Sequence, residues 1–415
     1  MVPSKNGYAQ NNAAFKLPPY EKLVLPNGLT LYLMEQHEVP TIDVAAIIPA
    51  GAIYDKTQSG LATLTASMLM NGTKQMTKSK LEEEIDFRGA EVYVYATKEA
   101  AHLNAKFAAK DADTVLQLVK EIMLMPAFNT LEFEKEKKLL LAQLEQAKES
   151  PRNVIGDYFS QVLFGSHVYA NPARGRASAV AKLTVQDVQQ FYKTYYKPNG
   201  AALAIAGDFK TAAMREKLTR LFSGWKEGST TALSIPKPTP ARTANVLLVN
   251  KEDASETTFM IGGPGVPRSN PDYVAVEVVN TVFGGRFTSW LNDELRINTG
   301  LTYGASSSFN RLKAGGSFQI STYTATKNTE AAMDKALAVL NRLHTTGIDD
   351  TTLTSAKNYV KGGFPPRFET ANQLADLMRQ MFWYGFDESF INTFQQSVDQ
   401  LTVAKAKEII ATYFP

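Results

Sequence analysis

The chain has 415 residues, of which 44% are hydrophobic and 20% charged, the balance of an ordinary globular protein. Its net charge of +3 comes from 44 basic and 41 acidic residues spread along the chain, so we expect no nucleic-acid partner. It contains no cysteine, which excludes disulfides, thiolate zinc sites and thiol nucleophiles.

The chain begins with the polar stretch MVPSKNGYAQNNAAF, which lacks the charged and apolar regions of a signal peptide. We expect residues 1–19 to form a flexible segment, and a mature terminus left by a removed leader would look the same. No run of about 18 apolar residues occurs in the sequence, so we also expect no membrane span.

The first half then alternates strand and helix patterns. A hairpin is predicted over Lys22–Glu35 around the turn Pro26-Asn27-Gly28, because apolar residues alternate on both sides of that turn. Further strands are expected at Thr41–Ala50, Ala90–Tyr95, His102–Ala108 and Gly200–Gly207, and helices at Gly60–Thr73, Ser79–Phe87, Val115–Met125, Leu131–Lys148 and Leu183–Tyr196.

The stretch Ser223–Ala241 marks a change in composition. It is rich in Ser, Thr, Gly and Pro, and three of its prolines alternate with other residues, which favours an extended chain. We expect it to be a linker between two domains. Beyond it, strands are predicted at Asn245–Lys251, Thr257–Gly263 and Ser317–Thr324.

The second half repeats the first. Leu183–Tyr196 and Leu401–Phe414 both begin with Leu-Thr-Val and both end with Thr-Tyr and an aromatic residue, 218 positions apart. Ser150–Gly165 and Pro365–Gly385 share a Pro-Arg start and an aromatic-Gly end. We therefore predict an α+β fold of two tandem homologous modules, each a mostly antiparallel sheet covered by helices on one face.

Two segments carry residues of possible chemical use. The helix Gly60–Thr73 reads GLATLTASMLMNGT, and the stretch Phe283–Ala305 reads FGGRFTSWLNDELRINTGLTYGA. In the second stretch, Gly284 and Gly285 are expected to break one helix, and Thr288–Leu295 to form another that ends at Arg296. Tyr303 is placed on the strand that follows.

Both segments resemble the insulinase/pitrilysin family of inverted zincins. In its active members the frame Gly-Leu-Ala … Met-Leu-x-x-Gly-Thr encloses His-x-x-Glu-His, which holds Zn²⁺ and activates water. Here those three positions are Thr63, Ala66 and Ser67. The family's third ligand, a Glu on a later helix, corresponds to Gln143, which lies 76 residues after Ser67.

The resemblance therefore implies a degenerate metal site. Hydroxyl and amide side chains are poor zinc ligands, and alanine cannot accept a proton. We expect no cofactor in this chain. Of the four histidines, His37, His102, His167 and His344, no two are spaced to share one helix face. His167 lies in a loop that is mainly architectural in the family.

The same resemblance gives the second segment a role. In the family an Arg and a Tyr at the positions of Arg296 and Tyr303 face the zinc across a central cavity. Arg296 would hold a substrate carbonyl, and Tyr303 would donate its hydroxyl to the oxyanion. Taken without the family frame, an Arg and a Tyr at this spacing indicate only a helix end and a half-buried strand residue.

The resemblance covers about residues 20–415 and implies the domains 20–222 and 242–415, joined by the linker 223–241. It predicts the non-catalytic subunit of a heterodimeric zinc peptidase, with zinc in a homologous partner subunit and an unfolded or peptide substrate. The alternative is a scaffold or peptide-binding protein of the same fold with no role in proteolysis. Some bacterial relatives are envelope or periplasmic proteins, which favours that compartment, but the sequence itself does not identify one.

Two smaller features complete the expectations. Arg311 and Lys313 lie in SSSFNRLKAGG and are predicted to form a solvated hairpin tip. The aromatic run Phe382-Trp383-Tyr384, with Phe386, is predicted to be core, with a subunit interface as the alternative.

Overall fold

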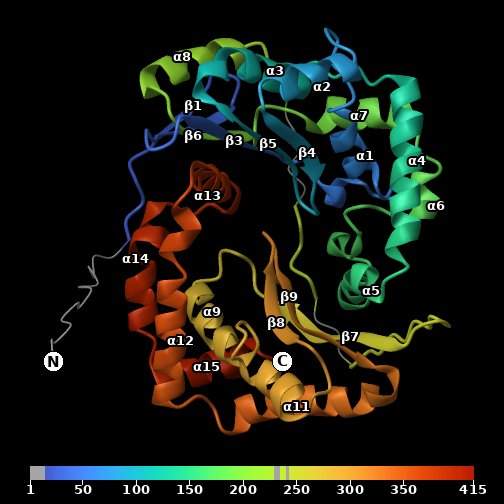
Figure 1. Ribbon diagram of the computed structural model, residues 1–415, viewed down its shortest axis with the longest axis vertical. Helices are drawn as coiled ribbons and strands as arrows, with labels where there is room; N and C mark the ends of the chain where they lie inside the picture. Colours follow the sequence, from blue (N-terminus) through green and yellow to red (C-terminus); the bar gives the residue numbers. More distant parts are fainter. Residues whose placement is uncertain (1–14, 229–233, 240–242) are drawn as a thin grey trace, which may run out of the picture.

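Two sheets organise the molecule, one in each half of the chain (Figure 1). The computed structural model describes residues 15–228, 234–239 and 243–415. The first half lies at the top of Figure 1 and the second half at the bottom. Each half has its own large apolar cluster, which agrees with the predicted pair of α+β modules.

The first sheet contains the predicted hairpin and the predicted later strands. Its described strands run in the order β1-β2-β6-β3-β5-β4, and every neighbouring pair is antiparallel except β2 and β6. The turn of the hairpin is held by Asn27, whose amide donates to the Phe222 and Trp225 carbonyls at 2.8 and 3.1 Å. The strands are β1 Glu21–Val24, β2 Thr30–Glu35, β3 Thr41–Ile48, β4 Glu91–Ala96, β5 Ala101–Ala108 and β6 Ala202–Gly207.

Helices of the first half cover one face of this sheet. Leu31, Leu33 and Leu203 point into their shared core, as the alternation of side chains along a strand requires. Thr184 and Asp187 form a capping box at the start of α7. The helices are α1 Leu61–Met68, α2 Lys78–Phe87, α3 Ala112–Leu124, α4 Thr130–Ala147, α5 Pro151–Phe164, α6 Ala177–Val180, α7 Val185–Tyr195 and α8 Thr211–Phe222.

The second sheet is smaller than the first within the described residues. Its three strands run in the order β7-β9-β8, all antiparallel. The prediction of a strand at Asn245–Lys251 is wrong, because this segment joins neither sheet and is exposed. The elements are β7 Glu256–Gly265, α9 Tyr273–Phe283, α10 Trp290–Asn292, β8 Ala305–Arg311, β9 Gly316–Ala325, α11 Thr329–Thr345, α12 Asp350–Gly362, α13 Ala371–Tyr384, α14 Glu388–Asp399 and α15 Val403–Tyr413.

Helix α13 belongs to the second half but covers the free face of the first sheet (Figure 1). Leu374 and Met378 pack there against Tyr32 and Met34, which point away from the first-half helices. This contact buries the second face of a sheet that the sequence pattern predicted to be covered on one face by its own helices.

Helix α5 makes the reciprocal contact with the second sheet. Arg152 pairs with Glu256 of β7 at 2.8 Å and lies 3.4 Å from the centroid of the Tyr323 ring. Phe159 approaches Gly262 so closely that a Cβ built there would lie 3.0 Å from its Cζ. Because α5 and α13 are the repeated helices found in the sequence, the two halves exchange equivalent elements.

A buried carboxylate joins the halves beside α13. Glu99 is 3% exposed and accepts hydrogen bonds from the Tyr169 hydroxyl at 2.5 Å, the Lys313 backbone N–H at 2.9 Å and the Trp383 indole N–H at 3.3 Å. Its partners come from both halves, so this polar contact fixes their relative position. Burial and the neighbouring Glu99 raise the pKa of the Tyr169 hydroxyl far above its usual range.

Arg311 and Lys313 lie where β8 turns into β9, as predicted, and Lys313 is exposed, but both side chains also make contacts within the protein that were not predicted. The Lys313 ammonium lies 3.7 Å from the centroid of the Trp383 ring, and Arg311 pairs with Glu277 at 3.4 Å. Trp383 is itself buried in the contact between the halves. The aromatic run around it is therefore core, as predicted, and part of that core joins the two halves.

The described part of the linker runs between the halves. Ile235 packs beside Phe164, and His167 donates a ring N–H to the Pro236 carbonyl at 2.9 Å. His167 therefore has a structural role here. The domain boundaries at 222 and 242 stay predictions. Among the described residues, no helix combines the length and the apolar character that crossing a membrane requires.

The contact between α13 and the first sheet contains a histidine that is held neutral. His102 of β5 stacks on Tyr95 with ring centroids 4.9 Å apart, and its Nδ1 is buried without a hydrogen-bond partner among the described residues. Burial, and then the charge of Arg379 on α13, lower the pKa of His102 to about 3. The unfolded chain therefore binds a proton at a pH where the folded chain does not.

We predict that this histidine destabilises the fold in mild acid. Its pKa is lower in the folded than in the unfolded chain, so protons favour the unfolded chain once the pH falls below about 6.5. The resulting loss of unfolding free energy reaches about 2 kcal/mol at pH 5. Urea unfolding should show that the free energy of unfolding falls less between pH 7 and pH 5 for His102→Gln than for the wild type. The exposed His344→Gln serves as control, and equal losses in both variants would contradict the assignment.

Candidate functional site

Helix α1 begins at a buried carboxylate. The Asp55 carboxylate accepts hydrogen bonds from the backbone N–H groups of Gly60 and Ala62 at 2.7 and 2.8 Å. Burial raises the pKa of Asp55 to about 7, against the opposing effect of these hydrogen bonds. Gly60 has a φ of +102°, a left-handed conformation that glycine adopts without strain.

The three degenerate positions on α1 have packing roles. Ala66 is fully buried, and the Thr63 hydroxyl donates to the Ala173 carbonyl at 2.5 Å. Ser67 is half-buried, and its carbonyl accepts from the Asn71 amide at 3.0 Å. The side chains of this helix therefore hold it against the loop around residue 173 and against its own C-terminal turn.

The fourth position lies on α4, which packs against α1. Gln143 is exposed, so it lies on the side of α4 that faces away from the core. Glu136, seven residues earlier, is half-buried and accepts a long hydrogen bond of 3.4 Å from Asn71. The helix on which the family resemblance places the third metal ligand is thus present, with Gln143 at that position. The Glu136 carboxylate on the same helix pairs with the Asn71 amide.

These residues do not fit a zinc ion. Thr63 and Ser67 offer neutral hydroxyls, Ala66 offers no polar atom and Gln143 offers an amide, whereas zinc sites use imidazole, thiolate and carboxylate groups. In the parts of the chain that the structure describes, no group of three or more His, Asp or Glu side chains is placed to hold a metal ion.

The second candidate segment is built around two glycines and a buried asparagine. The Asn280 carbonyl accepts the N–H groups of Gly284 and Gly285 at 2.9 and 2.7 Å, which ends α9. Ser307 of β8 donates its backbone N–H to the Gly284 carbonyl at 3.0 Å and its hydroxyl to the Asn280 side chain at 2.7 Å. A Cβ at Gly284 would lie 2.4 Å from the Ser307 hydroxyl, so only glycine allows this close approach.

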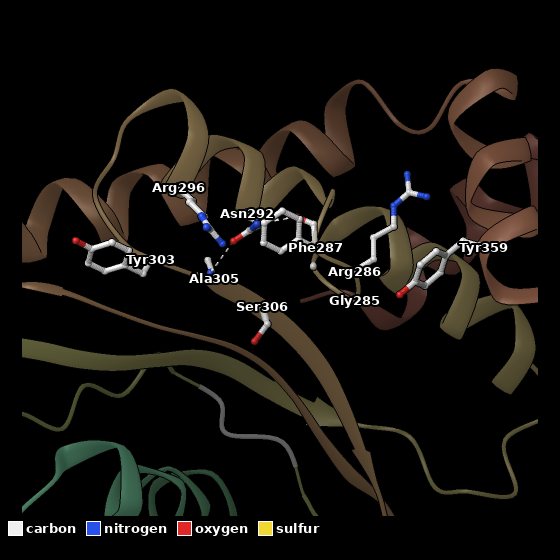
Figure 2. A pocket seen from close by; sticks show the side chains of 11 residues that line it. Gly285, Arg286, Phe287, Asn292, Arg296, Tyr303, Ala305, Ser306 and Tyr359 are labelled. Carbon is white, nitrogen blue, oxygen red and sulfur yellow. Dashed lines mark hydrogen bonds between the residues drawn. The ribbon is translucent and has the colours of Figure 1, made fainter. Parts of the chain in front are cut away.

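A second asparagine connects the helix to the strand. The Asn292 amide donates to the Phe287 carbonyl at 2.6 Å, and its oxygen accepts from the Ala305 N–H at 3.3 Å (Figure 2). Asn292 is buried, so the two bonds are shielded from water. They fix the two ends of the segment that carries Arg296 and Tyr303.

The structure brings Arg296 and Tyr303 to one pocket (Figure 2). Arg296 lies in a π-helical turn, Asp293–Asn298, which extends the predicted helix, and its guanidinium carbon is 4.7 Å from the centroid of the Phe287 ring. The prediction that Tyr303 lies on the strand is wrong, because β8 begins two residues later. The Tyr303 ring is in a loop, its residue 79% exposed, with the hydroxyl directed away from Arg296.

The pocket contains the guanidinium groups of Arg286 and Arg296, and no Asp or Glu is among its lining residues. No carboxylate within the described ranges forms an ion pair with Arg296, so its N–H groups are free to bind a carbonyl or carboxylate. Every residue that lines the pocket comes from the second half. The pocket therefore does not include the degenerate positions on α1 and α4.

Sequence reasoning missed the residues that hold this pair in place. Asn280, Asn292 and Ser307 are buried polar residues, and Phe287 and Tyr359 are exposed aromatics on the pocket wall. Asn280 and Asn292 lie on predicted helices, where a buried amide is unusual enough to have been a signal. Tyr359 comes from α12, which is remote in sequence, and no local pattern marks it.

Two family models match the chain. One, described as insulinase (peptidase family M16), matches residues 31–175. The other, described as peptidase M16 inactive domain, matches residues 182–360. Together they leave six residues between 31 and 360 unmatched. The resemblance found in the sequence is therefore confirmed.

Full-length similarity extends to bacterial proteins. The uncharacterized zinc protease ML0855 of Mycobacterium leprae is 24% identical over 397 residues, 94% of this chain and 88% of that protein. The non-peptidase homolog YmxG of Helicobacter pylori is 23% identical over 402 residues, 93% of this chain and 92% of that protein. Both kinds of name, zinc protease and non-peptidase, thus occur among proteins of similar sequence.

A mitochondrial protein is also similar over part of its length. Cytochrome b-c1 complex subunit 1 of Bos taurus is 27% identical over 281 residues, which is 67% of this chain and 57% of that protein. This chain therefore spans less than two thirds of that relative.

Solved structures share the fold over nearly the whole chain. The peptidase M16 inactive domain from Pseudomonas fluorescens has a TM-score of 0.89 at 23% identity, covering 96% of this chain and 95% of that one. A protease from Helicobacter pylori has a TM-score of 0.87 at 22% identity, covering 96% of this chain and 97% of that one. The chain belongs to the peptidase M16 family, as a member whose own metal-binding positions do not fit zinc.

Proposed function

We propose that this chain is the non-catalytic subunit of a heterodimeric zinc peptidase. Its partner is a homologous M16 chain that keeps the zinc ligands. This chain supplies Arg296 and Tyr303 to the shared site, and the substrate is an unfolded or peptide chain. The observation that carries the proposal is that one pocket presents an exposed Tyr303 and an Arg296 that forms no ion pair with any described residue, while Thr63, Ala66 and Ser67 offer no groups that suit zinc.

The two side chains have separate roles in this account. The partner's zinc ion, when bound, activates the attacking water. Tyr303 donates its hydroxyl to the oxygen of the scissile carbonyl, on which negative charge develops. Arg296 holds a neighbouring backbone carbonyl with its N–H groups. Both groups must reach outside their own chain, which their place on an open pocket wall allows.

Preorganisation supports this use of the pair. Asn292 fixes both ends of the segment through bonds of 2.6 and 3.3 Å, and Phe287 lies over the Arg296 guanidinium. A donor held in place before the reaction costs no reorganisation when charge develops. A segment kept only for packing would not need its Tyr side chain in solvent.

A second candidate is a scaffold with no role in proteolysis. The similarity to cytochrome b-c1 complex subunit 1 favours it, because that relative is by name a subunit of the mitochondrial cytochrome b-c1 complex. That role leaves unexplained the exposed Tyr303 and the lack of an ion pair to Arg296 in the described part of the chain. Peptidase activity that arises only when the chain is mixed with a zinc-bearing M16 homologue would separate the two candidates.

We predict that Tyr303→Phe lowers kcat of the reconstituted complex by about 100-fold, because one preorganised donor to an oxyanion is lost. The zinc content of the complex should not change, since Tyr303 is not a ligand. The measurement is steady-state cleavage of an extended fluorogenic peptide together with metal analysis. Tyr359→Phe is the matched control, because Tyr359 lines the same pocket from α12 and has no assigned role. Unchanged turnover in the Tyr303 variant would exclude the role.

Arg296→Ala should act mainly on substrate binding. Loss of a charge-assisted hydrogen bond is expected to raise KM about tenfold or more and to change kcat less. Arg296→Lys should restore part of the affinity, since a lysine keeps the charge but not the planar set of donors. A fall in kcat with KM unchanged would show instead that Arg296 acts in the transition state.

A further inference from the structure

Arg286 gives the pocket beside Arg296 a second guanidinium. Both arginines line that pocket, and its lining includes no Asp or Glu. Neither forms an ion pair with a described residue, whereas Arg311 and Arg367 of the same half both pair with Glu277, at 3.4 and 3.8 Å. The pocket therefore carries positive charge that the described part of the chain does not neutralise.

The backbone holds Arg286 in a fixed turn. Just before it, the Asn280 carbonyl accepts the N–H groups of Gly284 and Gly285. Just after it, the Arg286 carbonyl accepts the Ser289 N–H at 3.1 Å. A Cβ at Gly285 would lie 3.0 Å from the Asn280 carbonyl oxygen, so a side chain there would crowd the turn. Hydrogen bonds on both sides thus determine where the Arg286 side chain begins.

The Arg286 side chain has few partners of its own. One Nη donates to the Ser355 hydroxyl at 3.1 Å, and the guanidinium carbon lies 5.7 Å from the centroid of the Tyr359 ring. Both partners come from α12, one helical turn apart. The Nε is buried without a hydrogen-bond partner among the described residues, which is rare for a buried donor. The guanidinium is therefore held in place and keeps N–H groups for a ligand.

Phe287 separates the two guanidiniums along the pocket. Arg296 and Tyr303 lie on one side of it, and Arg286 and Tyr359 lie on the other (Figure 2). The pocket between them has a volume of about 440 Å³, which is usual for a ligand site. Phe287 is 64% exposed, so the wall between the two charges is aromatic and open to a ligand. A ligand that spans the pocket would contact Arg296 at one end and Arg286 at the other.

We propose that Arg286 binds a carboxylate of the substrate, so that the complex favours acidic peptides. This inference rests on the proposed function, because it takes the pocket as the place where the substrate lies. With the scissile bond beside Tyr303, an extended substrate reaches Arg286 with a residue on one side of that bond. Guanidinium groups bind carboxylates through paired N–H donors, and they repel lysine and arginine. The carboxylate comes either from an Asp or Glu side chain or from the carboxyl terminus of the peptide.

Peptides that differ at one position test the proposal in the complex of this chain with a zinc-bearing M16 homologue. In a neutral, amidated peptide that the complex cleaves, Glu and Gln are placed in turn at each position on both sides of the scissile bond. At one position or two neighbouring ones, Glu should raise kcat/KM at least about tenfold over Gln, as one charge-assisted hydrogen bond would. A peptide without acidic residues, compared with and without its terminal amide, shows whether a terminal carboxylate serves as well.

Variants assign the preference to Arg286. Arg286→Gln should bring the Glu-to-Gln ratio of kcat/KM toward one, and Arg286→Lys should restore part of it. Arg286→Glu should reverse the preference, so that a Lys peptide is cleaved faster than a Glu peptide, which a folding defect would not produce. Arg342→Gln is the matched control and should keep the ratio. Arg342 also lies over an aromatic ring, 4.2 Å from the Trp290 centroid, but outside the pocket.

Binding to the chain alone separates this inference from the proposed function. The Nε–H resonances of the arginines are followed by NMR as acetyl-Ala-Ala-Leu-Glu-Leu-Ala-Ala-amide or its Gln counterpart is added. The Arg286 resonance, assigned by its loss in Arg286→Gln, should shift with the Glu peptide and much less with the Gln peptide. High salt should reduce the shift, because it screens charges. If the mixture cleaves no peptide, the proposed function fails, and a selective shift would still establish the acid site.

Three results would overturn the inference. Equal cleavage of the Glu and Gln peptides at every position would do so and would leave the proposed function intact. The absence of a selective shift at Arg286 would also do so. The third is weaker association of Arg286→Gln with the homologue while the preference for Glu persists, which would make an acidic residue of the partner subunit the ligand of Arg286.

Discussion

The contact of α13 with the first sheet is the constraint on which the rest of the structure depends. Without it, Tyr32, Met34 and the alanines of β6 would form an uncovered apolar face. The cover comes from the other half of the chain, and α5 makes the equivalent contact in return. The two halves therefore hold one another in a fixed arrangement, to which the buried Glu99 adds a polar contact that only the correct arrangement satisfies.

This exchange explains how a metalloenzyme fold can persist without a metal. The helices α1 and α4 bury Ala66 and Phe133, and Thr63 bonds the loop that follows α5. None of these contacts involves an ion. Loss of the ligands therefore removes the chemistry of the first half and leaves its packing intact. In the second half, the hydrogen bonds of Asn292 and of the glycines at 284 and 285 fix the ends of the segment that carries Arg296 and Tyr303.

Much of this fold could be predicted from the sequence, because its elements carry regular local patterns. The hairpin at residues 22–35, the capping box at Thr184 and the repeat of α7 in α15 all follow from short-range spacing. The exchange of α5 and α13 could not be predicted, since alternation along a strand indicates one buried face and does not show that a helix from the other half covers the second face. The contacts of Arg311 and Lys313 could not be predicted for the same reason, because their partners Glu277 and Trp383 are distant in sequence.

The candidate site divides in the same way. The replaced residues Thr63, Ala66, Ser67 and Gln143 could be found by spacing within a known motif, whereas the buried asparagines that position Arg296 could not. The segment 245–250 was expected to be a strand because its composition is that of one. It pairs with no strand in the described part of the chain, and composition alone does not show whether a segment has a pairing partner.

The central claim is that this M16 chain has no metal chemistry of its own and acts only through another subunit. The most direct test is to measure zinc stoichiometry and cleavage of an unfolded polypeptide for the purified chain alone, and then for the chain mixed with a zinc-bearing M16 homologue. The account predicts no stoichiometric zinc and no cleavage for the chain alone, and cleavage by the mixture above that of the homologue by itself. One zinc ion per isolated chain, or cleavage without a partner, would contradict it.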